Sequence, residues 1–486
     1  MEDPAYEAFV VACPPAAEAR RRSTRVYRRV FEAIRGGRLV PGTRLPSARR
    51  LALAWQVARA AVDDAFTQLQ AEGLIERQVG NGSFVARRLP AGARTAAAAE
   101  APPDAATREV LQRLALLAEP AAPAAETVRL RPGVPDAASF PLAAWRRELA
   151  RALDPEDRAA LSYGWPAGLP ALRAATARHL SLTRSIDCRP EQVVIVGSVQ
   201  QAVGLVAQVL LEPGDRVAVD DPGLPAAARL LATAGLQVEG VPLDAQGFDV
   251  EYLRRHVADA AAVLLQPLNQ WPTGVRTAPA RQRALLDWAD LSGAWIVELD
   301  TLGEIVHDGA VPPPMAAADR AGRVLHLGSF SELMFPSLRL AWLLVPEPLV
   351  DVFAAVRGLL GEHSAVAAQA ALATFIDEGA LASHLRLLRR LYRTRRDALR
   401  DALARHLPAL VPGPMGGALH ACLPLHAAWN DRRVEAALRR RGVGAEALSR
   451  QAWRARGCNG LVLGYGDDEV DAIDAAVAEV ARVLAP

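Results

Sequence analysis

The most informative stretch of the sequence runs from residue 26 to residue 86: VYRRVFEAIRGGRLVPGTRLPSARRLALAWQVARAAVDDAFTQLQAEGLIERQVGNGSFVA. Apolar residues at helical spacing predict a first helix that ends at Gly36-Gly37, because glycine readily adopts the left-handed turn conformation. Ser47 is a good N-cap for a second helix, and a third helix is expected from about Val57. Gly80-Asn81-Gly82 then predicts a tight turn between two short strands. Three helices followed by a hairpin indicate a winged helix-turn-helix.

Charge is distributed unevenly along the 486 residues. All 56 basic residues are Arg, since the sequence contains no Lys, and 54 acidic residues leave a formal net charge of +2. Residues 20–50 contain 11 Arg and a single acidic residue, Glu32. An Arg-rich segment ahead of a nearly neutral remainder favours a nucleic-acid-binding module joined to a larger domain. A solvated Arg-rich surface with no ligand is the alternative that charge alone leaves open.

The pattern changes twice along the chain. Residues 20–88 form the predicted N-terminal module, and residues 89–127 are rich in Ala and Pro, which predicts a linker with one short helix. From residue 128 to residue 486, short apolar runs such as VVIVG (193–197) alternate with longer amphipathic segments. This alternation predicts an α/β domain with a mostly parallel sheet that is covered by helices on both faces.

Several classes of protein are disfavoured by the sequence. We find no secretory signal at the N-terminus and no run of about 18 apolar residues that could span a membrane. The four Cys and nine His are scattered without metal-ligand spacing. We therefore expect a cytoplasmic protein with free thiols, no membrane association and no metal site.

Residues 26–86 resemble the GntR-type DNA-binding domain. The resemblance rests on LPSARR (45–50), on VAR (57–59) at the start of the third helix, and on EGLI (72–75) with GNGSFV (80–85) in the wing. It implies double-stranded operator DNA as the partner, with Arg59 at base edges in the major groove, where a guanidinium group recognises guanine. Ala58 stands where the family usually has Ser. The resemblance also implies that Arg44, Ser47 and Arg49 contact phosphates. The DNA-contacting residues that we expect are therefore Arg44, Ser47, Arg49, Arg59, Arg77, Asn81 and Gly82.

The C-terminal part, residues 128–486, resembles the fold-type I aminotransferase domain that follows the GntR module in the MocR class of regulators. The matching segments include RPGVPDAASFP (131–141), YGWPAGLPALR (163–173), PLNQWPTGV (267–275) and GSFSELMFPSLRLAW (328–342). The resemblance implies large and small subdomains built around a mostly parallel sheet. It also implies a homodimer that binds repeated or inverted operator half-sites.

The residues that would bind pyridoxal phosphate are changed in this sequence. Aligned by these motifs, Glu332 stands where the family has the Schiff-base lysine, Leu299 stands for the aspartate and Thr301 for the tyrosine. Leu224 replaces the aromatic residue that would stack on the ring, whereas Ser329, Ser331 and Arg339 keep the phosphate-binding positions. Without a lysine amine, a covalent aldimine on a lysine is excluded. We therefore expect no cofactor.

Three interpretations of this pocket remain open: it is filled and structural, it binds a different small effector, or it binds pyridoxal phosphate without a covalent bond. For Arg339 alone, an ion pair with Glu332 is the alternative to contact with a ligand. The pocket residues common to the three interpretations are Ser198, Leu224, Asn269, Leu299, Thr301, Ser329, Ser331, Glu332 and Arg339.

The leading hypothesis is a sequence-specific DNA-binding transcriptional regulator. Its aminotransferase-like domain is then catalytically inactive and serves dimerisation and possible sensing of a small-molecule effector. The alternatives are a pyridoxal phosphate-dependent aminotransferase and a regulator that senses pyridoxal phosphate non-covalently. A third class is an enzyme that uses Glu332 or Asp300 as a general base.

Overall fold

The computed structural model describes residues 22–78, 82–90, 129–154, 161–361, 363–454 and 457–485. The chain divides into two compact units, residues 1–118 and residues 119–486, and each is described by itself. The predicted linker at 89–127 lies, apart from residues 89 and 90, outside the described residues.

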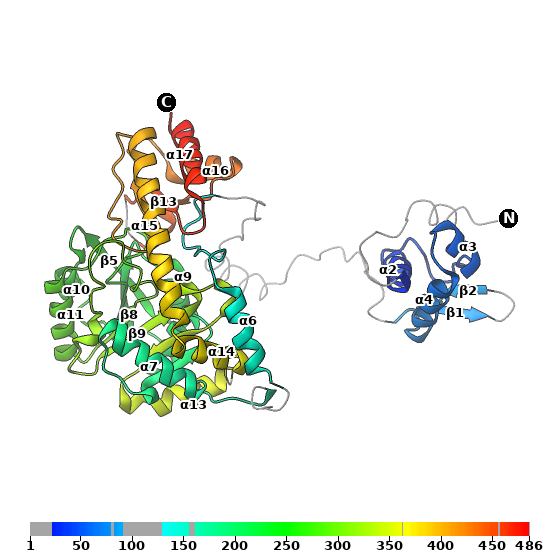
Figure 1. The fold of residues 1–486 in the computed structure, drawn as a ribbon, viewed down its shortest axis with the longest axis horizontal. Coiled ribbons are helices and arrows are strands. Elements are labelled where there is room, and N and C mark those ends of the chain that lie inside the picture. The colour runs from blue at the N-terminus through cyan, green and yellow to red at the C-terminus, as the bar shows by residue number, and fades with distance from the viewer. Residues whose placement is uncertain are drawn as a thin grey trace. The chain divides into compact units, whose positions relative to one another are not determined.

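The N-terminal unit is a winged helix-turn-helix, as the sequence predicts (Figure 1). Its helices are α2 (Arg22–Arg35), α3 (Ala48–Ala54) and α4 (Arg59–Ala71). Strands β1 (Ile75–Gln78) and β2 (Gly82–Val85) pair antiparallel and form the wing. The helices enclose a small apolar core because each presents apolar residues to the inside at helical spacing. Its fully buried members include Val26, Val30, Leu51, Phe66 and Leu69.

The two helices of the helix-turn-helix differ in how they begin. The Ser47 hydroxyl oxygen accepts a hydrogen bond from the Arg50 backbone N–H at 3.3 Å, which caps α3 as expected. At the start of α4 the N-cap is Ala58, whose methyl group can accept nothing from the backbone. The orphan N–H groups of the first turn of α4 therefore lack a capping side chain.

We expect Ala58→Ser to stabilise the N-terminal unit. A hydroxyl at the N-cap accepts a backbone N–H that is otherwise satisfied by water, which is worth about 0.5–2 kcal/mol. Calorimetry of the full chain should show the transition of this unit moving to higher temperature. Ala60→Ser, inside the first turn of α4, is the matched control and should give no such gain. Equal shifts for both variants would contradict the capping argument.

An eight-stranded sheet forms the centre of the C-terminal unit, with strand order β3-β10-β9-β8-β7-β4-β5-β6. Strands β5, β4, β7, β8 and β9 run parallel to one another, β10 is antiparallel to both β3 and β9, and β6 is antiparallel to β5. The mostly parallel sheet is thus confirmed. The strands are β3 (Val193–Val196), β4 (Arg216–Asp221), β5 (Gln237–Asp244), β6 (Gly247–Phe248), β7 (Ala262–Leu265), β8 (Trp295–Leu299), β9 (Val324–Ser329) and β10 (Ala341–Leu344).

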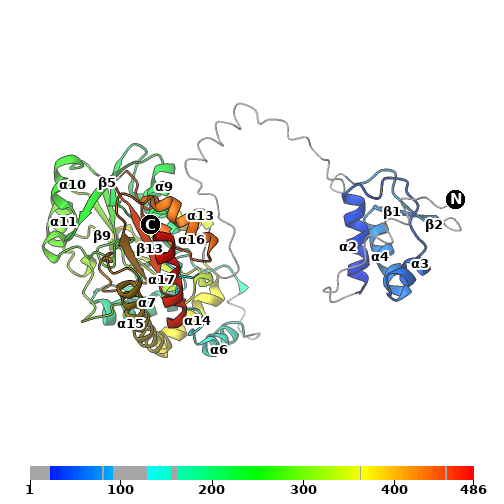
Figure 2. The same ribbon diagram turned by 90° about the horizontal axis from the view of Figure 1, so that it is seen from above.

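Helices cover both faces of this sheet (Figure 2). Alternate residues of a strand point to opposite faces, so Val194 and Val196 of β3 join one apolar cluster while Val193 and Ile195 join another. The flanking helices include α7 (Pro170–Arg184), α8 (Val199–Leu210), α9 (Pro225–Thr233), α10 (Val250–His256), α11 (Pro279–Ser292) and α13 (Val350–Gly361). The continuous apolar runs of the strands are explained by burial on both sides.

A smaller subdomain follows the large one, as the family resemblance implies. Its three-stranded antiparallel sheet has the order β11-β13-β12, and the long helix α15 packs lengthwise against α17. The remaining elements are α6 (Leu142–Ala152), α12 (Phe330–Leu333), α14 (Val366–Asp377), α15 (Ala380–His406), α16 (Asp431–Arg440), α17 (Val470–Leu484), β11 (His420–Pro424), β12 (Glu446–Ala447) and β13 (Gly460–Gly464). Among the described residues, no helix has the length and apolar character that a bilayer crossing requires.

Candidate functional site

The predicted phosphate contacts lie on the surface of the N-terminal unit. Arg44, Ser47 and Arg49 are all exposed. The guanidinium carbon of Arg44 lies over the Phe84 ring, 5.9 Å from the ring centroid. The Arg44 side chain also lies beside Gly82 in the wing. A Cβ at Gly82 would stand 3.4 Å from Arg44 Nε, and Gly82 has a φ of +104°, which glycine adopts without strain. The structure thus brings Arg44 and Gly82 together, while Asn81 lies outside the described residues.

Arg59 is the first residue of α4, and its side chain is 71% exposed. Its Nε lies 3.5 Å from Asp63 Oδ2, one helical turn further on. This pair is exposed to solvent, so it contributes little to stability and leaves the guanidinium able to reorient toward a ligand. The position at the start of the third helix is the one from which helix-turn-helix proteins contact base edges.

Arg77 is placed differently from the other candidates. Its guanidinium pairs with Asp63 Oδ1 at 3.0 Å and lies over the Phe66 ring at 5.6 Å. These contacts join the base of the wing to α4, so the observed role of Arg77 is to hold two parts of the module together. Asp63, which was not among the predicted contacts, contacts both Arg59 and Arg77. Its position four residues after Arg59 on the same helix was the sequence signal for the pair with Arg59.

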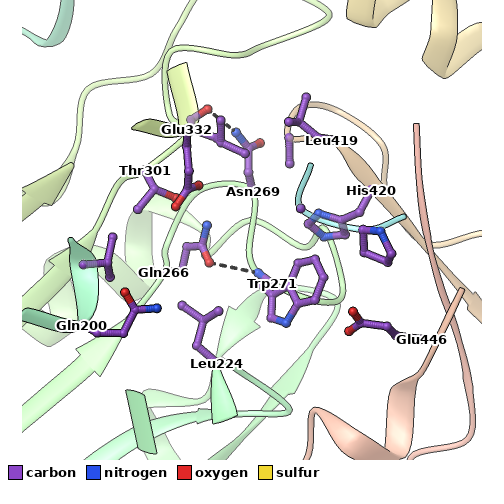
Figure 3. A pocket seen from close by; sticks show the side chains of 15 residues that line it. Gln200, Leu224, Gln266, Asn269, Trp271, Thr301, Glu332, Leu419, His420 and Glu446 are labelled. Carbon is purple, nitrogen blue, oxygen red and sulfur yellow. Dashed lines mark hydrogen bonds between the residues drawn. The ribbon is translucent and has the colours of Figure 1, made fainter. Parts of the chain in front are cut away.

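In the C-terminal unit, a cavity of about 270 Å³ opens between the large and small subdomains (Figure 3). The segments that follow β4, β7 and β8 contribute Leu224, Asn269 and Thr301, and the short helix α12 that follows β9 contributes Glu332. Ligands of α/β proteins bind at this carboxyl edge of parallel strands. Residues from elsewhere complete the lining: Pro132, Gly133, Val199, Gln200, Gln266, Trp271, Leu302, Ala418, Leu419, His420 and Glu446.

A second cavity, of about 160 Å³, adjoins the first because Glu332 lines both. It contains the residues that were expected to bind phosphate, namely Ser198, Ser329, Ser331 and Arg339. Leu299 is buried in the apolar core and borders a void of only about 10 Å³, together with Leu224. The structure therefore brings the nine predicted pocket residues to three adjoining spaces.

The serine hydroxyl groups of the smaller cavity are engaged with the backbone. Ser198 Oγ accepts from the Gln201 N–H at 3.1 Å, and Ser329 Oγ accepts from the Glu332 N–H at 3.3 Å. Ser331 Oγ both donates to the Leu340 carbonyl oxygen and accepts from the Leu340 N–H. The proton of the Ser331 hydroxyl is thus committed to the Leu340 carbonyl oxygen, so fewer groups can donate to an anion than the sequence suggested.

The expected ion pair between Arg339 and Glu332 is absent from the described residues, and that alternative is wrong. Arg339 is exposed and has a left-handed backbone conformation with φ of 53°. Glu332 points into the larger cavity beside Thr301 (Figure 3). Burial raises the pKa of Glu332, and the neighbouring Thr301 hydroxyl lowers it in part because it stabilises the charged form.

Asn269 also lies at the cavity, but its amide is turned toward the protein. Its Nδ2 donates to the carbonyl oxygens of Leu302 at 3.1 Å and Ile305 at 3.3 Å. Asn269 has a φ of 52°, a conformation that asparagine tolerates better than most residues. Its observed function is therefore to fix the loop that carries Thr301 and Leu302.

Asp300 is not part of any described cavity, although its neighbours are. Its Oδ2 accepts from Arg184 Nη2 at 2.6 Å and Nε at 2.9 Å and lies 3.0 Å from His326 Nε2, all in the interior. Burial acts to raise the pKa of Asp300, but the hydrogen bond from His326 and the charge of Arg184 outweigh it and lower the pKa. Asp300 therefore has one carboxylate oxygen committed to Arg184 and His326 and does not line the described cavities, which disfavours the general-base role considered for it.

Sequence reasoning missed the residues that give the cavity its polarity. Burial raises the pKa of Asp220, at the end of β4, to about 7, although the Gln266 N–H partly offsets this. Burial lowers the pKa of His420 to about 4, so its ring is neutral at pH 7. The His420 and Trp271 rings pack edge to face, with their ring centroids 4.8 Å apart. Trp271 lies within the motif PLNQWPTGV, so that motif was a usable signal for it.

Comparison with known families assigns each unit. Residues 22–85 match the model of the bacterial regulatory proteins of the GntR family. Residues 126–419 match the model of class I and II aminotransferases. Among characterised proteins, the chain is 32% identical over 448 residues to the probable rhizopine catabolism regulatory protein MocR of Rhizobium meliloti, covering 90% of each chain. The chain belongs to the MocR class of GntR-family transcriptional regulators.

Further comparisons agree with this assignment. The MocR-class chain is 30% identical to the pyridoxine biosynthesis transcriptional regulator PdxR of Corynebacterium glutamicum, over 95% of each chain. Its fold is shared with Pyrococcus horikoshii kynurenine aminotransferase, at a TM-score of 0.70, 24% identity and coverage of 79% of this chain and 94% of that one. The protein is therefore a DNA-binding transcriptional regulator whose larger domain has the fold-type I aminotransferase fold.

Proposed function

We propose that the aminotransferase-like domain of this regulator is catalytically inactive, and that it serves to form a homodimer and to sense a small effector. The observation that carries the proposal is Glu332, a carboxylate in the cavity at the position that aligns with the Schiff-base lysine, in a sequence without any lysine. Leu299, buried among apolar side chains, offers no counter-charge to a pyridinium nitrogen. Both of the groups that make pyridoxal phosphate an effective electron sink are thus replaced.

A second copy of the chain is the proposed partner of the C-terminal unit. Large apolar side chains are exposed where residues 161–168 approach α13 and α14: Leu161 is 76% exposed, Tyr163 is 82% exposed and Leu359 is 87% exposed. Isolated exposed apolar residues are ordinary, but several on neighbouring segments are typical of an interface. A dimer would present two DNA modules to repeated or inverted half-sites.

The DNA-binding role implies action in the cytoplasm.

The proposal predicts how the protein responds to pyridoxal phosphate. After mixing and treatment with borohydride, peptide mapping should find no adduct on any side chain. The reason is that the sequence contains no lysine, so no side chain carries a primary amine.

Glu332→Lys is the positive control, since it places an amine in the same cavity and should yield an adduct at residue 332. A stoichiometric adduct on the wild-type chain at any side chain would overturn the proposal. Transamination activity in the wild-type protein would do the same.

A further inference from the structure

The cavity between the subdomains has acidic rather than basic character. Among the described residues that line it, Glu332 and Glu446 are carboxylates and none is an arginine. Asp220 lies beneath it, in the void shared with Leu224, Gln266 and Trp271. The larger cavity thus has two carboxylates in its lining, while the arginine of this region, Arg339, lines the adjoining smaller cavity.

Glu332 is a partly buried acid whose charged form a cation in the cavity would stabilise. Its carboxylate points into the cavity, and the nearest polar side chain that acts on it is the Thr301 hydroxyl. No ion pair of Glu332 occurs among the described residues. Burying a carboxylate without a counter-charge costs free energy, which a bound cation would recover.

His420 gives an independent sign that a ligand belongs here. It is 4% exposed, it lines the cavity, and its Nε2 has no hydrogen-bond partner within the described parts of the chain. Buried polar atoms are usually satisfied, so an orphan nitrogen at a cavity marks a missing group. A neutral imidazole nitrogen can accept a hydrogen bond from a polar group of a ligand. Trp271, packed against His420, offers an apolar aromatic surface for the body of that ligand.

We propose that the cavity binds a small organic ammonium compound, with the charged nitrogen against Glu332 and the apolar body against Leu224, Trp271 and Leu419. The volume of about 270 Å³ accommodates a ligand of roughly the size of one aromatic side chain with its substituents. This inference rests on the proposed effector-sensing function and names the chemical class of the effector.

Three ligands of equal shape and different charge test the proposal: benzylamine, benzyl alcohol and benzoate, titrated calorimetrically into the full chain at pH 7. Benzylamine should bind about tenfold or more tightly than the other two, because a charged hydrogen bond replaces a neutral contact or a repulsion. In Glu332→Gln this preference should disappear. Glu251→Gln, an exposed carboxylate on α10, is the matched control and should keep it.

The possible results of this experiment distinguish a failure of the cation-site proposal from a failure of the proposed effector-sensing function. The proposal is overturned if benzylamine does not bind at 10 mM, if the neutral or anionic ligand binds equally well, or if Glu332→Gln retains the preference. Affinity for operator DNA is measured in parallel with and without benzylamine. Selective binding that leaves the DNA affinity unchanged supports the cation site and contradicts the effector-sensing function, since a ligand regulates only by binding two states unequally.

Discussion

Replacing Asp300 with alanine is expected to lower the free energy of unfolding of the C-terminal unit by about 3–5 kcal/mol. Asp300 lies directly after β8, and its side chain is 3% exposed. The variant would leave the guanidinium of Arg184, which is 1% exposed, without its carboxylate partner. His326 would lose the same partner. An uncompensated buried charge is among the most destabilising changes that a single substitution makes.

Asp377→Ala is a control matched in distance but not in burial. Asp377 lies 2.6 Å from Arg178 Nη2, the same separation as between Asp300 and Arg184, yet the two side chains are 47% and 57% exposed. Solvent screens this pair, so its loss should cost at most about 1 kcal/mol. Urea unfolding monitored by circular dichroism measures both variants. Similar losses would mean that the interior cluster around Asp300 does not stabilise the fold.

The same comparison has a defined pH dependence. The pKa of Asp300 is lowered in the folded protein, so its stabilising contribution is complete above the unfolded pKa, about 3.9. It is lost as the pH falls through the folded pKa, because the protonated carboxyl no longer pairs with Arg184. The difference between wild type and Asp300→Ala should therefore be constant near neutral pH and shrink only below about pH 4.

Local signals made the N-terminal module predictable. The first helix ends at Arg35, directly before Gly36-Gly37, and Ser47 caps the next helix. Both features depend on residues that are neighbours in sequence, where backbone preferences act directly. The contact of Asp63 with Arg77 spans 14 residues and depends on how the wing packs against α4. No periodicity in the sequence reports such a contact, so Arg77 was expected at the DNA.

The pocket shows the same division between local and non-local information. Family motifs located Thr301 and Glu332, which lie within three residues of the ends of the buried strands β8 and β9. They did not indicate that His420 and Trp271 would meet there, since 149 residues separate the two and their contact requires both subdomains. Likewise, opposite charges at Arg339 and Glu332 suggested an ion pair, but the left-handed backbone at Arg339 accompanies an exposed side chain. Charge complementarity along a sequence does not fix side-chain direction.

Arg59→Ala is expected to weaken operator binding by about 1–3 kcal/mol and to relax the base preference at one position of each half-site. Operator sequences are first selected from a random pool with the wild-type protein. Affinity for the selected and a shuffled duplex is then measured at several salt concentrations. The variant should lose affinity for the selected duplex much more than for the shuffled one. The fold should be unaffected, because the pair with Asp63 is exposed and 3.5 Å long.

Arg49→Ala provides the contrast that separates base recognition from charge. Both residues are exposed arginines of the helix-turn-helix, so each variant removes one positive charge from the same module. A phosphate contact carries no sequence information, so Arg49→Ala should weaken binding to both duplexes equally and reduce the salt dependence by about one counterion. If Arg59→Ala behaves like Arg49→Ala, Arg59 contacts the DNA backbone. Base recognition must then come from another residue of α4, since that helix would still be the element nearest the bases.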